Sequence, residues 1–308
     1  MNLNEYCEQL RAGGFKAVLG SEKTAWISHE RFSVLRQPTF ALDVPSKEEI
    51  DRVFKQSRVA MLSFITRPSD ELAANSCLYV CSNPEYSLEK LGQSARSHIR
   101  RALAEFEIRF LDQFEFLRLG KPAYYDTLAR AGLSADHREF EAGFLRPRAA
   151  RRCLGALKGD RLAAFLLVTE VDDWVSISGY SANEFLPLRP NNGLIHYVLH
   201  HHLVEKNFRV VDYGLSSIQA DSKAEGLHKF KLKVGFESVP VHRAFVVHPL
   251  LRPFVNSISW KLTNRMLKLS PQHPLLKKAE GALRMALQSA TDEYAQRRKQ
   301  LYFFRSRL

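Results

Sequence analysis

The sequence predicts an α/β protein of the α+β kind, with mixed and mostly antiparallel sheets and a helical C-terminal extension. Apolar runs typical of buried strands, such as VAMLSFI at 59–65 and SCLYVC at 76–81, alternate with amphipathic stretches typical of helices. Three further apolar runs between residues 153 and 180 are joined by short turns, which indicates an antiparallel meander. From Pro249 onward the sequence becomes helical in pattern and basic.

The first 145 residues alternate strand and helix signals. The expected strands are 17–19, 25–28, 59–65, 76–81 and 107–111. One helix is expected from Ser46 through Gln56, with Ser46 as its N-cap and Glu49 completing a capping box. Further helices are expected from an N-cap at Ser87 through Ala102, over 121–131 with Pro122 in the first turn, and over 134–144.

The second half begins with the meander, whose strands are expected at 153–157, 161–168 and 174–180. A loop over 181–192 then leads to a helix that begins at Gly193, a strand over 209–213, a turn over 214–217, a basic helix over 226–233 and a strand over 239–248. This order resembles that of the first half, although no residue-level repeat is visible. We therefore expect two structurally similar halves, residues 1–145 and 146–248, and a basic helical extension over 249–308 that consists of helices at 251–268 and 274–301.

Composition places the chain among folded proteins with a basic surface. Its 308 residues are 45% hydrophobic and 25% charged, and 45 basic against 33 acidic residues give a net charge of +12. Such a surface attracts nucleotides, nucleic acid or anionic membranes without choosing among them. The N-terminus carries no signal-peptide pattern, and no apolar run approaches the ~20 residues that span a bilayer. We therefore expect a cytoplasmic protein.

The cysteines and histidines give no sign of a metal site. The four cysteines form no CxxC pair, so we expect reduced, mostly buried thiols. His196 and His200 are four residues apart on a helix, a spacing that can bind zinc, but Tyr197 stands where the HExxH pattern has glutamate. We expect no metal, while a histidine acting as general base stays open.

Three motifs, taken together, resemble one enzyme group. Arg96-Ser97-His98-Ile99-Arg100-Arg101-Ala102 resembles an R-x-x-I-R-[KR]-A element, and Val211-Asp212-Tyr213-Gly214 resembles a hydrophobic-D-[FY]-G element. The segment GLHKFKLKVGF at 226–236 resembles G-[LI]-x-x-F-K-x-x-[FL]-G, with one extra residue before Gly235. These are motifs of the Fem-type branch of the GNAT acyltransferases, which includes peptidoglycan-bridge aminoacyltransferases. The resemblance covers about half the chain.

The resemblance implies tandem GNAT-like halves and transfer of an acyl or aminoacyl group, from acyl-CoA or aminoacyl-tRNA, to an amine of an envelope or polysaccharide precursor. The chain departs from GNAT enzymes that bind CoA, because Leu188–Gly193 carries one glycine where their [QR]-x-x-G-x-[GA] loop has two. A helix that starts near Gly193 can still offer free N–H groups to a phosphate, and Arg189 can add charge. The chain also lacks room between 153 and 247 for the helical hairpin with which Fem-type enzymes contact tRNA.

Acyl transfer needs a deprotonated amine, stabilisation of the oxyanion and a proton for the leaving group. Asp212 can act as base or orient the amine, or it caps the turn. Tyr213 can protonate the leaving group, or it packs. Lys231 can bind a phosphate or a developing negative charge, or it belongs to a solvated basic face. Phosphate or carboxylate groups of the substrates are assigned to Arg189, Gly193, Arg96, Arg100 and Lys229.

Two other functional hypotheses stay open beside the acyltransferase. One is an enzyme that transfers arginine or leucine to protein N-termini on a similar fold. Another is a non-catalytic GNAT module that binds RNA or anionic membrane through its basic surface. Near the C-terminus Phe254, Ile258, Trp260 and Leu262 lie among basic residues, a pattern of helices that rest on anionic membranes or pack on a core. A location peripheral to the inner face of the membrane is therefore also expected.

Overall fold

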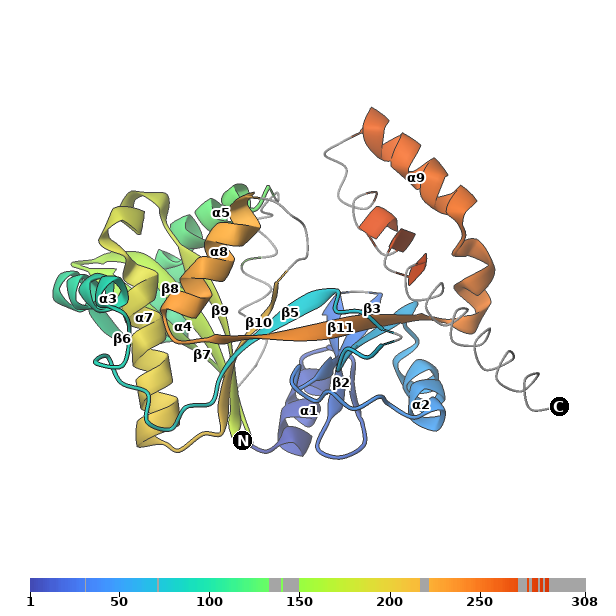
Figure 1. The fold of residues 1–308 in the computed structure, drawn as a ribbon, viewed down its shortest axis with the longest axis horizontal. Coiled ribbons are helices and arrows are strands. Elements are labelled where there is room, and N and C mark those ends of the chain that lie inside the picture. The colour runs from blue at the N-terminus through green and yellow to red at the C-terminus, as the bar shows by residue number, and fades with distance from the viewer. Residues whose placement is uncertain are drawn as a thin grey trace. The chain divides into compact units, whose positions relative to one another are not determined.

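The computed structural model describes residues 1–30, 32–70, 72–132, 140, 150–216 and 222–270, together with 276, 279–281, 283, 284, 286 and 287. The described chain forms two compact units, each made from two separate stretches (Figure 1). Unit 1 contains Met1–Phe15 and Cys77–Val239, and unit 2 contains Lys16–Ser76 and Pro240–Leu308. The predicted halves 1–145 and 146–248 follow the chain in order, whereas the units do not, and the assignment of a GNAT-like fold to each half stays a prediction.

Unit 1 is built on a sheet with the strand order β5-β10-β9-β8-β7-β6. Its strands are β5 (Ser76–Cys81), β6 (Glu107–Leu111), β7 (Arg151–Lys158), β8 (Arg161–Val171), β9 (Trp174–Ser181) and β10 (Val210–Ser216). The β10–β9 pair is parallel and the other pairs are antiparallel. The predicted meander is therefore confirmed as β7, β8 and β9, with turns at Gly159 and Asp172 in left-handed backbone conformations.

Helices cover both faces of this sheet. The described helices of unit 1 are α1 (Leu3–Ala12), α3 (Gln93–Glu105), α4 (Gln113–Leu119), α5 (Lys121–Arg130), η1 (Asn183–Leu188), α7 (Pro190–Leu199), η2 (His200–Glu205) and α8 (Ser222–Lys233). Phe165 of β8 packs on Phe116 of α4 and stacks on Tyr180. Glu170 lies five residues further along β8, and because successive side chains of a strand point to opposite faces, it lies on the other face, against His202 of η2. The face opposite α4 therefore carries η2 and, continuous with it, α7, which packs along α3 (Figure 1).

Unit 2 repeats this mixture of pairings in a smaller sheet, with the strand order β1-β2-β3-β4-β11. The strands are β1 (Ala17–Leu19), β2 (Ala25–Glu30), β3 (Ser33–Gln37), β4 (Met61–Thr66) and β11 (Glu237–Val247), and only the β3–β4 pair is parallel. Its helices are α2 (Lys47–Ser57), η3 (Pro249–Phe254) and α9 (Ser257–Leu269). The predicted α/β class with mixed, mostly antiparallel sheets is confirmed.

The start of α2 confirms one half of its predicted capping box and contradicts the other. Ser46 Oγ accepts a hydrogen bond from the Glu49 N–H at 3.2 Å, as an N-cap does. Glu49 itself turns away from the cap, because its carboxylate accepts hydrogen bonds from Trp26 Nε1 at 2.7 Å and from Ser21 Oγ at 2.5 Å. A buried carboxylate with two fixed donors is held there more strongly than by an exposed backbone N–H.

The predicted helix start at Ser87 is wrong. The chain turns over residues 83–92, and α3 begins at Gln93 after Gly92. The guanidinium of Arg96 donates to the backbone oxygens of Glu89 and Leu91, at 3.1 and 3.2 Å, so these carbonyls are satisfied without a helix. The helices α1 and α4 were not predicted. The helix expected over 134–144 lies almost wholly outside the described residues, as does most of the one over 274–301.

The four cysteines are unpaired thiols, three of them buried and Cys77 half-buried. Burial raises the pKa of Cys7, Cys81 and Cys153, so these thiols stay protonated. Within the part of the chain that the structure describes, no helix has both the length and the apolar character to cross a bilayer.

Candidate functional site

The strand β10 carries a bulge at the Asp-Tyr-Gly motif. Asp212 pairs with Val80 of β5 but Leu215 pairs with Leu78, so β10 holds one residue more than its partner. Gly214 takes a left-handed conformation at φ +72°, and its N–H donates to Asp212 Oδ1 at 2.7 Å. The predicted turn after residue 213 is therefore a bulge inside the strand, and Asp212, 1% exposed, stabilises that bulge.

Lys231 of α8 brings an ammonium group to this bulge. Its side chain is buried, with 3% exposed, and Nζ donates a hydrogen bond to the backbone oxygen of Tyr213 at 2.9 Å. The same nitrogen lies 4.2 Å from the centre of the Tyr79 ring and 4.5 Å from the centre of the Tyr213 ring. Ring faces attract a cation, so this arrangement holds a positive charge with little help from water.

The charge on this lysine is finely balanced. Burial lowers the pKa of Lys231 to about 8, while the Asp212 carboxylate acts in the opposite direction. At pH 7 the group is therefore mostly an ammonium with three N–H donors. Among the described residues the Tyr213 oxygen is its one hydrogen-bond acceptor, so two donors are available to a further anion or carbonyl oxygen.

Tyr79 and Tyr213 place their rings against the Lys231 ammonium. Tyr79, from β5, is buried, and its hydroxyl lies 2.6 Å from Nδ1 of His228, one helical turn before Lys231 on α8. The Tyr213 ring packs on Phe236, 5.3 Å between ring centres. Burial raises the pKa of Tyr213 to about 12, so its hydroxyl remains a proton donor at neutral pH.

The end of α8 is fixed by Tyr86. Its hydroxyl donates to the Val234 oxygen at 3.3 Å and lies 3.3 Å from His196 Nδ1 on α7. Gly235 follows with φ +107°, and a Cβ there would lie 2.7 Å from the Tyr86 ring. Glycine at this position therefore allows the close approach that sets α8, and with it Lys231, against β10.

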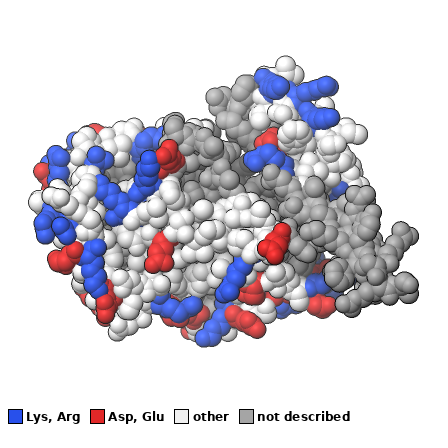
Figure 2. Space-filling model, in the orientation of Figure 1, with Lys and Arg blue, Asp and Glu red and all other residues white. Residues whose placement is uncertain are grey.

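A group of cations gathers where α3, the start of α7 and the end of α8 meet. Lys233 Nζ donates to Ser94 Oγ at 2.6 Å and lies 3.4 Å from His98 Nδ1. The pKa of His98 is lowered, first by burial and then by the charges of Lys233, Arg189 and Arg101. We call these residues the His98 cluster. Figure 2 shows Lys and Arg atoms gathered on this side of unit 1, where Figure 1 draws α3 and α8. Such a cluster suits a phosphate or diphosphate.

The predicted phosphate-binding residues fall into different surroundings. Arg189 is exposed in a left-handed conformation directly before α7 and joins the His98 cluster. Gly193 is buried, and a Cβ there would lie 3.0 Å from Ala102 Cβ, so this glycine brings α7 against α3. Arg96 holds the turn described above, and Arg100 is exposed on the same helix. Their predicted roles in substrate binding stay predictions.

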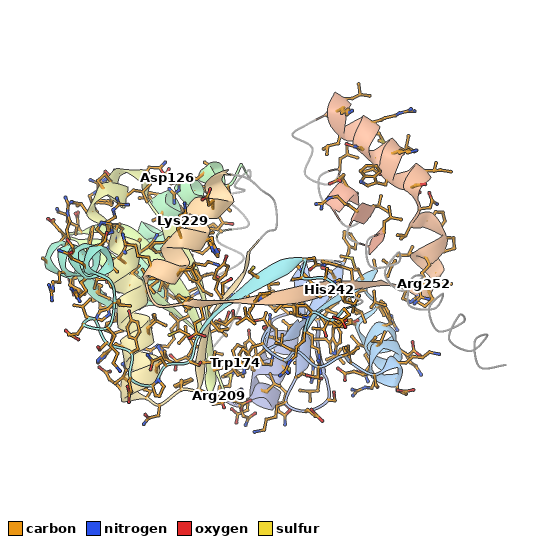
Figure 3. The ribbon with its side chains drawn as sticks, viewed as in Figure 1. Asp126, Trp174, Arg209, Lys229, His242 and Arg252 are labelled. Carbon is orange, nitrogen blue, oxygen red and sulfur yellow. The ribbon has the colours of Figure 1, made fainter. Side chains whose placement is uncertain are left out.

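Lys229 points away from Lys231, although only two residues separate them. It is labelled on α8 in Figure 3, and its Nζ lies 2.6 Å from Glu225 Oε1, one turn earlier on the helix. Lys229, Lys231 and Lys233 therefore have three different partners: a carboxylate on their own helix, the β10 bulge and the His98 cluster.

The consecutive histidines of η2 diverge. His200 and His201 lie 3.1 and 2.6 Å from the carboxylate oxygens of Glu205, while buried His202 lies 2.9 Å from the Val198 oxygen and 3.3 Å from Glu170 Oε1. His202 holds the pKa of Glu170 at about 2. Within the described ranges no three His, Cys, Asp or Glu side chains are placed to share a metal ion.

Four residues of the site were not predicted as functional: Tyr79, His228, His98 and Lys233. Tyr79 lies in a strand predicted as buried, and its signal was a polar hydroxyl in the apolar run SCLYVC. His98 and His228 occupy variable positions of the motifs described above, so their contacts are visible only once the helices are placed.

No family model and no curated protein matches the chain. Solved structures do match. FemX is similar with a TM-score of 0.55 at 13% identity, over 82% of this chain and 93% of that chain. L-PGS from Bacillus licheniformis is similar with a TM-score of 0.49 at 12% identity, over 82% of this chain and 89% of that chain. A GCN5-related N-acetyltransferase from Kribbella flavida gives a TM-score of 0.42 at 8% identity, over 81% of this chain and 96% of that chain. At 13% identity the FemX match shows the fold alone, and a fold shared with FemX is the one that the sequence motifs predict.

Proposed function

From the FemX fold, we propose that this protein is an N-acyltransferase that moves an acyl or aminoacyl group to an amine of an envelope or polysaccharide precursor. Its donor is acyl-CoA or aminoacyl-tRNA. One observation carries the proposal: the buried ammonium of Lys231 has donors to spare beside the β10 bulge. Asp212, Tyr213 and Lys231 would belong to the proposed second GNAT-like half, residues 146–248, while Tyr79 comes from the first half.

The chemistry follows from the charges of the site. When an amine attacks an ester or thioester carbonyl, negative charge develops on the carbonyl oxygen. Lys231 would donate to that oxygen, and its burial makes the interaction stronger than it is in water. The Tyr213 hydroxyl would supply a proton to the leaving oxygen or sulfur, and Asp212 would orient the amine and accept the proton that its nitrogen loses on attack. Return of that proton to Tyr213 would restore both side chains for the next turnover.

The donor's phosphates would bind at the His98 cluster. Lys233 and Arg189 place two charges there, and among the described residues neither has a carboxylate partner. Arg96, Arg100 and Lys229 would extend this surface toward an anionic acceptor or donor tail. We expect Lys233→Ala and Arg189→Ala to raise the KM for the donor several-fold and to leave kcat nearly unchanged.

The first experiment separates the two donors and tests Lys231. Purified wild-type protein is incubated with acetyl-CoA, or with a tRNA pool charged with radiolabelled amino acids, in the presence of nucleotide-linked muropeptide and amino-sugar acceptors. We expect transfer from one donor class, and a fall of about 10²–10³ in kcat for Lys231→Ala with unchanged circular dichroism. The control is Lys158→Ala, which removes an exposed lysine at the end of β7 that pairs with Glu105.

Two results would contradict the proposal. If Lys231→Ala turns over like wild type, Lys231 has no part in the reaction. If neither donor class gives transfer, and the protein binds tRNA in a salt-sensitive way, the chain is a non-catalytic binding module. A pH profile adds a further check, because kcat should fall as the pH rises through about 8, where Lys231 loses its charge.

A further inference from the structure

The helix α9 has an exposed face that is both apolar and basic. Ile258, Leu262 and Met266 are spaced four residues apart, and Leu269 continues the row one turn later. They are exposed, at 76% for Ile258, 59% for Leu262 and 86% for Leu269. Four large apolar side chains in one row on an exposed helix are more than the scattered single residues of an ordinary surface. We call this row the α9 stripe.

The basic residues of α9 lie along one edge of the stripe. Lys261, Arg265 and Lys268 each come directly before a residue of the stripe, so they lie on the same exposed half of the helix. From Pro249 to Leu269 the sequence has four basic residues and no acidic one. Figure 2 shows Lys and Arg atoms along this helix, and Figure 3 shows side chains projecting from it, with Arg252 labelled nearby.

The opposite side of α9 is less exposed than the stripe. Trp260 is half-buried and its Nε1 donates to Glu280 Oε1 at 3.1 Å, and Thr263 and Leu267 are half-buried on the same side. The sequence pattern leaves open whether Trp260 faces a membrane or packs on the protein, and this hydrogen bond turns the indole to the packed side. The helix therefore needs no rearrangement to present the stripe.

We propose that α9 docks on the surface of a bilayer that contains anionic lipids, with the α9 stripe in the boundary between headgroups and acyl chains. Helices that lie in this boundary bury an apolar face by about 5–10 Å and use Lys and Arg for the headgroups. The long stems of Lys261, Arg265 and Lys268 allow their charges to reach the phosphates while the stripe is immersed. The inference stands on α9 alone and does not depend on the proposed transfer reaction.

Vesicle co-sedimentation tests this directly. The full chain is mixed with vesicles of phosphatidylcholine alone, or with vesicles in which roughly 30% of the lipid is anionic phosphatidylglycerol. We expect binding to the anionic vesicles, at least tenfold weaker binding to neutral ones, and weakening by salt. The double variant Ile258→Ser, Leu262→Ser should bind about tenfold more weakly or worse, because two apolar side chains no longer enter the lipid.

Matched variants control for composition and charge. Phe114→Ser removes an apolar side chain that is 86% exposed on α4, and it should bind like wild type. Lys261→Glu with Arg265→Glu should abolish the preference for anionic vesicles, whereas Arg52→Glu with Lys55→Glu on exposed positions of α2 should reduce binding only slightly. Unchanged thermal unfolding of each variant shows that the fold is kept.

Three results would overturn the proposal. One is no binding of the wild type to anionic vesicles. Another is equal binding of wild type and the stripe variant. The third is a concentration-dependent dimer in sedimentation equilibrium that the stripe variant dissociates, which would assign the stripe to a second copy of the chain.

Discussion

The basic helices α8 and α9 look alike in sequence and differ in what they do with their charges. Both carry basic residues at short intervals and apolar residues between them. In α8 one lysine, Lys231, is buried against aromatic rings and a backbone oxygen. In α9 every basic residue stays exposed beside exposed apolar side chains. A run of basic residues can therefore bind anions at the surface where its charges remain in water. It can supply a reactive group where burial has changed the pKa of one of its members.

The largest effect on stability is expected from pH, which should affect the buried Lys231 and the exposed lysines of α9 differently. In the folded protein the pKa of Lys231 is about 8, below its unfolded value, so between about pH 8 and 10.5 the unfolded chain binds more protons. The free energy of unfolding of wild type should therefore rise with pH relative to Lys231→Met, by about 3 kcal/mol over this window. Denaturant titrations at pH 7 and 10.5 measure it. Lys261→Met on α9 should show no such difference from wild type, and a flat difference for Lys231→Met would mean that Lys231 is not buried as described.

A smaller effect concerns how firmly each helix is held. Gly235→Ala forces a left-handed backbone on alanine and places its Cβ 2.7 Å from the Tyr86 ring. We expect a loss of about 2 kcal/mol in the free energy of unfolding, together with lower activity because α8 no longer sets Lys231 correctly. Gly92→Ala, where a Cβ meets no atom, is the control and should change stability little. Equal effects of the two substitutions would show that Gly235 matters only for chain flexibility.

The smallest effect is expected at the end of α9. Leu269→Ser removes a side chain that is 86% exposed, so the free energy of unfolding should change by no more than about 0.5 kcal/mol. Thermal unfolding without lipid measures this. A loss above about 2 kcal/mol would mean that Leu269 packs in solution, and the contrast with α8 would then disappear.

Much of the fold followed from local pattern. The strands β5, β6, β8 and β9 begin where alternating or continuous apolar runs begin, because a strand inside a sheet must place apolar side chains on both faces. Local pattern gave a wrong helix start at Ser87 and a wrong hydrogen-bond partner for the side chain of Glu49. There the competing partners, Arg96 and the pair Trp26 and Ser21, are side chains whose positions depend on packing.

The site was predicted in its elements and not in its contacts. The Asp-Tyr-Gly and Phe-Lys motifs predicted a site made by the segments that form β10 and α8. In the structure Lys231 of α8 donates a hydrogen bond to the backbone oxygen of Tyr213 on β10. The second ring around the ammonium comes from Tyr79, more than 130 residues earlier in the chain, and no spacing rule connects the two. For the same reason the His98 cluster, assembled from three helices, was not visible as a unit.

The α/β class, most strand positions and the basic character of α8 and α9 can be predicted from the sequence, because they depend on the order and period of neighbouring residues. Which lysine of GLHKFKLK is buried depends on packing, since the rotation of α8 relative to β5 and β10 is set by Tyr86, Gly235 and the bulge at Gly214. Burial depends on atoms brought from distant parts of the chain, and burial is what separates a reactive ammonium from a solvated one.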